Sequence, residues 1–179
     1  MTGMRPPKVS VVMPVYKGDE YLSEAVDSIL NQTFTDFEFI IICDDPTEKT
    51  RQILDKYEQS DSRIKVYYQE REGLVNSLNR GCSLARGEYI ARMDADDISL
   101  PERFEKQSKF LDSNQCVGVL GTDIRFIDCY GNPHPDVHPP YIPTEPNVIQ
   151  WYLMFYCCIQ HPTVMFRKSV YDQMGGYSN

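Results

Sequence analysis

The sequence has 179 residues, of which 41% are hydrophobic and 25% charged, proportions typical of a globular protein with one sizeable core. Its 26 acidic residues outnumber its 18 basic residues, which gives a formal net charge of −8. This balance argues against a nucleic-acid-binding protein, because the phosphate backbone is bound mainly through Lys and Arg. An acidic protein that handles a phosphorylated ligand needs a metal ion or backbone amides to offset the charge.

The cysteines and the apolar segments bear on location. No cysteines have the CxxC spacing of a metal site, and Cys157 and Cys158 are adjacent, so we expect reduced, mostly buried thiols and an intracellular chain. No apolar run reaches the roughly 20 residues of a membrane span. No long apolar stretch precedes the first expected strand, so no signal peptide is predicted. The prediction is a cytoplasmic protein, which could associate with the inner face of a membrane through features that these residues do not show.

Strand and helix patterns alternate along the first two thirds of the chain. Strands are predicted where β-branched and aromatic residues cluster, and helices where apolar residues recur every three or four positions. The expected strands are 8–16, 37–43, 63–69, 88–93 and 116–128, and the expected helices are 19–32, capped by Asp19, 46–59, 73–86 and 101–114. This alternation predicts an α/β fold with a doubly wound, mainly parallel sheet and helices on both faces.

The pattern changes after residue 129. Residues 130–147 hold six of the twelve prolines, which predicts a long surface loop that could cover a site. Residues 148–159 are predicted as a buried helix, with a strand as the alternative, and Trp151 is expected in the core. Residues 162–167 are predicted as a strand, and 168–177 as a short helix that ends at glycine.

Polar side chains follow three of the predicted strands, where each strand ends. Tyr16, Asp44 and Asp94 come directly at or after the strand ends. In a doubly wound sheet, ligands bind outside the carboxyl ends of the strands. The sequence therefore predicts one site that these three side chains share.

A cluster of carboxylates follows the fourth strand. Asp94, Asp96 and Asp97 lie within four residues, and such neighbours repel one another unless a positive charge offsets them. Mg²⁺ and Mn²⁺ prefer oxygen ligands and often complete their coordination with substrate phosphates, so a metal site is one interpretation. The alternative is a solvated acidic turn in which Asp97 or Ser99 caps the next helix.

The other polar candidates carry weaker signals. Asp44 could accept a hydrogen bond from a nucleobase or a ribose hydroxyl, or could cap the following helix, a role that Asp45 fits well. His161 is an isolated histidine, and such residues more often pack in the structure or face solvent than bind a ligand. His134 and His138 are interpreted as loop residues.

Three segments together resemble the family 2 glycosyltransferases, which have the GT-A fold. They are VSVVMPVYKGDEYLSEAVDSILNQTFTDFEFIII, GLVNSLNRGCSLARGEYIARMDADDISLPERF and HPTVMFRKSVYDQMGGY, and the resemblance extends from about residue 8 to residue 177. It implies an enzyme that moves a sugar from a nucleotide donor, usually UDP-linked, to an acceptor hydroxyl with inversion. It also implies Mg²⁺ or Mn²⁺ as cofactor, a carbohydrate or lipid-linked sugar as acceptor, and a role in polysaccharide or cell-wall biosynthesis.

The resemblance also implies roles for particular residues. Asp44 is expected to pair with the uracil N–H, Asp94 to lie near the ribose, and Asp96 to bind the metal at the DXD motif, with Asp97 behind it. The expected nucleotide-binding residues are Pro14, Val15, Tyr16, Asp44, Gly73, Asn79 and Asp94.

The sequence departs from the family pattern in two places. Cys43, Asp45 and Pro46 replace the usual residues around the second-strand acid, so the following loop is expected to differ in shape. The family's catalytic base is an Asp shortly after the GGY motif, whereas no acid follows Asp172 here. The catalytic residue is therefore unknown, and the base is expected to lie beyond Asn179, the last residue of the sequence.

We expect a single GT-A domain cut before its base, with residues 8–130 as the donor-binding half and 131–179 as the start of the acceptor-side half. The alternative is a nucleotide-sugar-binding module without turnover. A nucleotidyltransferase is less consistent with the sequence, because PVYKGDEY lacks a glycine-rich basic loop.

Overall fold

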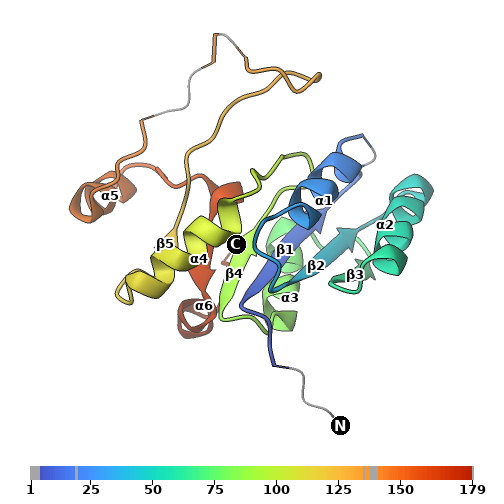
Figure 1. The fold of residues 1–179 in the computed structure, drawn as a ribbon, viewed down its shortest axis with the longest axis horizontal. Helices are drawn as coiled ribbons and strands as arrows, with labels where there is room; N and C mark the ends of the chain where they lie inside the picture. The colour runs from blue at the N-terminus through green and yellow to red at the C-terminus, as the bar shows by residue number, and fades with distance from the viewer. Residues whose placement is uncertain (1–4, 19, 135, 138–140, 179) are drawn as a thin grey trace.

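The computed structural model describes residues 5–18, 20–134, 136–137 and 141–178, and the expected cap Asp19, the loop residue His138 and the last residue Asn179 lie outside this part (Figure 1). Its centre is a six-stranded sheet in the order β3-β2-β1-β4-β6-β5. The strands are β1 Val9–Val15, β2 Phe37–Asp44, β3 Ile64–Gln69, β4 Tyr89–Arg92, β5 Val119–Leu120 and β6 Met165–Arg167. The first four strands are parallel, and β6 runs antiparallel to β4 and β5. The predicted doubly wound, mainly parallel sheet is confirmed.

Helices cover both faces of this sheet because its central strands are apolar on both sides. The helices are α1 Leu22–Leu30, α2 Glu48–Ser60, α3 Leu74–Leu84, α4 Arg103–Ser113, α5 Pro146–Leu153 and α6 Lys168–Met174, with a 3₁₀ turn at His161–Thr163. Val11 packs in the cluster that holds the buried hydrophobic residues of α1, α2 and α4. The next residue, Val12, packs in the opposite cluster with Leu78 and Cys82 of α3. Alternate side chains of β1 therefore anchor two hydrophobic layers.

The predicted strand over 116–128 is largely wrong. Only Val119–Leu120 pairs with the sheet, and farther along a single bridge joins Ile127 to Pro133. The partner strand β6 is three residues long, so it offers few backbone groups for pairing.

The prediction of a buried helix around Trp151 is wrong in its burial. The helix α5 lies wholly within the described residues and buries none of its side chains, and Trp151 is 56% exposed. Figure 1 shows α5 at the end of a long segment, away from the sheet. Its aromatic rings pack on one another instead, as in the Trp151–Phe155 pair at 5.0 Å between centroids.

Two smaller expectations also differ from the structure. Thr47, not Asp45, caps α2, because its side chain accepts a hydrogen bond from the Thr50 backbone N–H. The six cysteines, all in the described part of the chain, form no disulfide with one another, as expected for reduced thiols, but only Cys43, Cys82 and Cys158 are buried. Among the described residues, no helix is long and apolar enough to cross a membrane.

Candidate functional site

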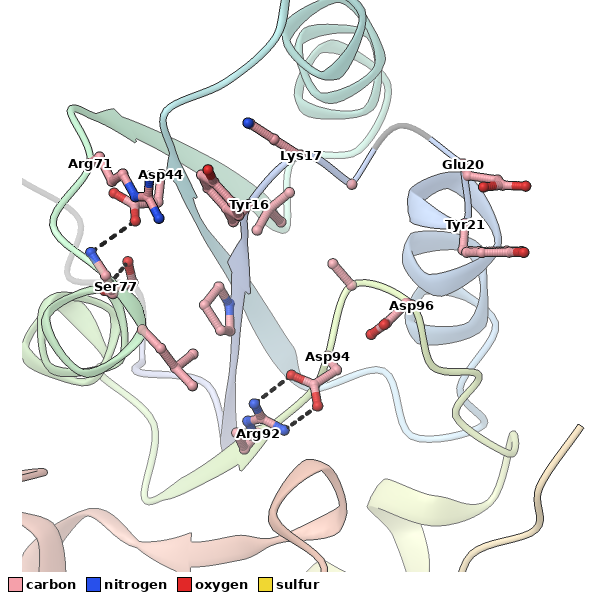
Figure 2. A pocket seen from close by; sticks show the side chains of 16 residues that line it. Tyr16, Lys17, Glu20, Tyr21, Asp44, Arg71, Ser77, Arg92, Asp94 and Asp96 are labelled. Atoms are coloured by element: carbon pink, nitrogen blue, oxygen red, sulfur yellow. Dashed lines mark hydrogen bonds and ion pairs between the residues drawn. The ribbon is translucent and has the colours of Figure 1, made fainter. Parts of the chain in front are cut away.

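A cavity of about 710 Å³ opens at the carboxyl ends of β1, β2 and β4 (Figure 2). Seven of the eight residues predicted for the site line it: Pro14, Val15, Tyr16, Asp44, Gly73, Asp94 and Asp96. Parallel strands deliver their last residues to the same edge of the sheet, which is why segments so distant in sequence meet here. The predicted convergence of Tyr16, Asp44 and Asp94 is therefore observed.

Asp44 organises the loop that follows β3. Its carboxylate accepts hydrogen bonds from the backbone N–H of Glu72 at 2.8 Å, the backbone N–H of Gly73 at 2.9 Å and the side chain of Gln69 at 3.2 Å. Burial raises the pKa of Asp44, but these hydrogen bonds outweigh it and lower the pKa below 3.8. The charged form is thus held rigidly at the cavity wall. Gly73 has a φ of +86°, a conformation that favours glycine.

Tyr16 places a flat ring in the cavity close to two cations. The ring is 43% exposed, and the Lys17 ammonium and the Arg71 guanidinium each lie 5.1 Å from its centroid. These distances fit cation–π contacts, which favour a positive group over an aromatic face. Lys17 has a φ of +49°, so the chain turns sharply after β1. The ring offers a stacking surface in a positively charged corner of the cavity.

Asp94 and Asp96 have different surroundings. Asp94 forms an ion pair with Arg92, which donates to both carboxylate oxygens. Within the described residues, the Asp96 carboxylate has no hydrogen-bond or ion-pair partner, and Figure 2 shows Asp94 between it and Arg92. Burial raises the pKa of Asp97, and the charges of Asp94 and Asp96 raise it further. Asp96 is therefore the carboxylate available to a cation.

The arrangement suits a metal that is held jointly with a phosphorylated ligand. No group of three or more His, Cys, Asp or Glu side chains in the described ranges could hold a metal ion by itself. Mg²⁺ and Mn²⁺ sites often use one or two carboxylates and complete the coordination with substrate phosphates. The free carboxylate of Asp96, at the wall of a cavity large enough for a nucleotide, fits this pattern.

The alternative of a solvated acidic turn is wrong in its capping role, although residues 95–96 do form a turn and Asp96 and Asp97 are exposed. The residue that precedes α4 is Glu102, and no side-chain hydrogen bond caps this helix. Neither Asp97 nor Ser99 occupies the capping position. The Ser99 backbone N–H instead donates to the Ser28 hydroxyl at 3.0 Å, which fastens the acidic loop to α1.

Asn79, the eighth predicted residue, is not among the described residues that line the cavity. Its side chain donates to the Tyr177 carbonyl at 2.9 Å and accepts from the Tyr177 backbone N–H at 2.8 Å. The Tyr171 hydroxyl donates to the same Asn79 oxygen at 2.9 Å. His161 is half-buried 3.3 Å from the Tyr177 hydroxyl, and burial lowers its pKa, so neutral imidazole is favoured. These contacts tie the GGY segment to α3.

The catalytic base has no assigned residue in this site. The resemblance to family 2 glycosyltransferases implies a base shortly after the GGY segment, and Asn179 is not among the residues that the structure describes. The described chain ends one residue earlier, directly after the GGY segment that Asn79 holds. The expected position of the base therefore stays a prediction.

Sequence reasoning missed several residues of the cavity wall: Lys17, Gly18, Glu20, Tyr21, Arg71, Leu74, Ser77, Arg92 and Ala95. Arg92 carried a detectable signal, because an arginine inside an apolar strand requires a carboxylate partner nearby. Arg71 carried none, since it lies in a polar loop whose path depends on Asp44.

Comparison with known proteins identifies relatives along nearly the whole chain. The family model described as "Glycosyl transferase family 2" matches residues 10–174 of this chain. An uncharacterised glycosyltransferase of Methanocaldococcus jannaschii is 46% identical over 132 residues, covering 72% of this chain and 46% of its own. The O-antigen biosynthesis glycosyltransferase WbnJ of Escherichia coli is 40% identical over 171 residues, covering 94% and 65%. The chain thus spans about half to two thirds of the length of these relatives.

Solved structures share the fold at lower identity. A mannosyltransferase of Pyrobaculum calidifontis, solved with GDP-Man and Mn²⁺, matches 97% of this chain and 48% of its own, with a TM-score of 0.71 and 17% identity. Residues 1–349 of Staphylococcus aureus TarS, solved with UDP, match with a TM-score of 0.70 and 22% identity, covering 94% and 49%. These similarities confirm the expected GT-A fold.

Proposed function

The chain belongs to glycosyl transferase family 2, and from this membership we propose that it binds a nucleotide-sugar donor, most simply UDP-linked, for transfer to an acceptor hydroxyl with inversion. The observation that carries the proposal is the cavity at the sheet edge, where Tyr16, Asp44 and Asp94 surround the space and Asp96 has no partner among the residues that the structure describes. In this proposal residues 8–130 bind the donor and 131–179 begin the acceptor side.

Each part of the donor has a candidate partner. The nucleobase stacks on Tyr16. The N–H of the nucleobase donates to a lone pair of the Asp44 carboxylate that the hydrogen bonds from the backbone do not use. Asp94 accepts from the ribose. Lys17 and Arg71 add positive charge that attracts an anionic ligand into an otherwise acidic protein.

Asp96 would hold Mg²⁺ or Mn²⁺ together with the donor diphosphate. Such an ion acts as a Lewis acid and offsets the negative charge that develops on the departing nucleoside diphosphate. The solved relative with GDP-Man and Mn²⁺ supports this assignment by analogy. Asn79, in contrast, acts on the nucleotide only through the structure of α3 and the GGY segment.

A second cavity of about 240 Å³ adjoins the first and shares Tyr21 and Asp96 with it. We place the acceptor sugar here, because an acceptor hydroxyl must approach the donor next to the metal. Inversion also requires a base that takes the proton of this hydroxyl. No acid follows Asp172, so we place the base beyond Asn179, and a binding module without turnover is the alternative function.

Titration calorimetry with UDP and GDP, in Mn²⁺ and in EDTA, tests donor binding. The unaltered chain should bind one of the nucleotides in a metal-dependent manner. Asp96→Asn should weaken that binding at least about tenfold, equivalent to ~1.4 kcal/mol. The exposed Asp123, changed to Asn, is the matched control and should bind like the unaltered chain. Metal-independent binding, or full affinity in Asp96→Asn, would remove the metal assignment.

A turnover assay separates the two functions. The purified chain is incubated with Mn²⁺, UDP-sugars and simple sugar acceptors, and the release of UDP is measured. Release that depends on the acceptor would refute the binding-module alternative. Nucleotide binding without any release would favour it for this chain.

A further inference from the structure

Arg92 is an unusual residue for the end of a central strand. Its side chain is almost fully enclosed, with 4% of the residue exposed. Among the described residues, its Nε–H is the one buried side-chain N or O group without a hydrogen-bond partner. Burying a guanidinium in this way costs free energy unless strong pairing offsets it. A residue with this cost calls for an explanation in the site.

Both the backbone and the side chain of Arg92 are held in place. Its backbone N–H donates to the Val164 carbonyl at 2.9 Å, and its carbonyl accepts from the Arg103 guanidinium at 2.7 Å. The end of its own guanidinium donates to both oxygens of Asp94, with one distance of 2.5 Å. A planar fork against a planar carboxylate fixes the orientation of both groups, which a lysine could not do.

This pairing determines what Asp94 can still do. Each carboxylate oxygen can accept about two hydrogen bonds, and Arg92 uses one position on each. Because Asp94 also lines the cavity, its remaining positions are available to hydroxyl donors of a ligand. The adjacent positive charge disfavours a divalent cation at Asp94. Figure 2 shows Asp94 between Arg92 and Asp96, and within the described residues Asp96 forms no ion pair with Arg92, so this effect is weaker at Asp96.

We propose that Arg92 is a positioning residue that keeps Asp94 off the metal ion and orients its carboxylate to accept from the ribose hydroxyls of the donor. The inference rests on the proposed nucleotide-binding function. It explains by the buried Arg92 why Asp94 binds the ribose and Asp96 binds the metal. Arg92 itself contacts the donor only through Asp94.

The test compares a nucleotide with its analogue that lacks the ribose hydroxyls. Dissociation constants of UDP and 2′,3′-dideoxy-UDP are measured with Mn²⁺ for the unaltered chain, Arg92→Lys and Arg63→Lys. Arg63 is the matched control, because it also pairs with both oxygens of an aspartate two residues away, Asp61, but lies outside the cavity lining. GDP and its dideoxy analogue replace the pair if the chain binds GDP.

Hydrogen bonds from the ribose hydroxyls to the charged Asp94 carboxylate are strong. We therefore expect the dideoxy analogue to bind about 10- to 150-fold more weakly than UDP in the unaltered chain and in Arg63→Lys. In Arg92→Lys the positive charge of residue 92 remains, but the orientation of the Asp94 carboxylate is lost. The ratio of the two dissociation constants, dideoxy analogue over UDP, should therefore fall towards one. A general folding defect would weaken both ligands alike and leave the ratio unchanged.

A ratio that stays high in Arg92→Lys, or a ratio near one in the unaltered chain, would overturn the inference while leaving the proposed function intact. If the unaltered chain bound neither UDP nor GDP, the proposed function itself would fail. If Arg92→Lys does not fold, the inference is tested by the NMR chemical shift of the buried Arg92 Nε–H in the unaltered chain. This chemical shift should change on addition of UDP and less so with the dideoxy analogue, and equal changes would refute the inference.

Discussion

Replacing Asp44 with Asn tests how the loop after β3 is held. The carboxylate receives two backbone N–H groups, from Glu72 and Gly73, on different oxygens. An asparagine has one carbonyl oxygen, so one of these N–H groups would face an NH₂ group and lose its acceptor, at about 1–3 kcal/mol. The other bond would change from a charged to a neutral acceptor, at about 1 kcal/mol.

The sum predicts a loss of roughly 2–4 kcal/mol in the free energy of unfolding at pH 7. For a chain of this size, that corresponds to a fall in Tm of roughly 5–15 °C. The measurement is urea and thermal unfolding followed by circular dichroism. Asp45→Asn is the matched control, since Asp45 is exposed with a φ of +51°, which Asn tolerates, and this variant should stay within about 0.5 kcal/mol.

The dependence on pH gives a second check. The hydrogen bonds lower the pKa of Asp44 in the folded protein below its ordinary value of 3.8. The stabilisation is therefore fully present above the unfolded-state pKa and is lost as the pH falls through the folded-state pKa. The difference between the unaltered chain and Asp44→Asn should shrink below about pH 4. Equal stability of Asp44→Asn and Asp45→Asn at pH 7 would refute this account of the loop.

Two further changes address the core and the GGY segment. Phe104→Ala should lower the free energy of unfolding by about 3–5 kcal/mol, because the side chain is fully buried, whereas Phe110→Ala on the exposed side of the same helix should have little effect in urea unfolding. Asn79→Ala should lower the free energy of unfolding by about 1–3 kcal/mol, because the backbone N–H and carbonyl of Tyr177 both lose their hydrogen bonds to Asn79. Asn76→Ala, which breaks a single exposed hydrogen bond, should cost less. If calorimetry showed that Asn79→Ala loses UDP affinity at unchanged stability, Asn79 would belong to the nucleotide pocket.

The parallel core could be predicted because its signals are local. The runs around Val11 and Ile41 are predominantly apolar, which favours strands buried on both faces. Helical periodicity in α1 and α3 then placed a covering helix after each strand. Along the chain the first four observed strands alternate with helices as predicted, whereas their order in the sheet is β3-β2-β1-β4.

The expected strand over 116–128 and the expected burial of Trp151 failed for a shared reason. Both stretches are rich in apolar residues, but apolar character describes only the tendency to be buried. Whether burial occurs depends on a partner surface, and within the described residues β6 is short and α5 has no element packed over its aromatic side chains. Such partners are contributed by distant parts of the chain and leave no local trace.

By itself, the sequence determined the alternation of strands and helices, the edge of the sheet that carries the site, and the acids that gather there. Hydrophobic periodicity and strand ends are properties of neighbouring residues, so they can be read without coordinates. Only the tertiary structure decided the pairing of these acids. It pairs Asp94 with Arg92, leaves Asp96 without a partner in the described part of the chain, and lets Asp44 accept a hydrogen bond from the Gly73 backbone. Hydrogen bonds and ion pairs depend on ångström-scale distances between segments, and these distances exist only once the sheet and its helices have packed.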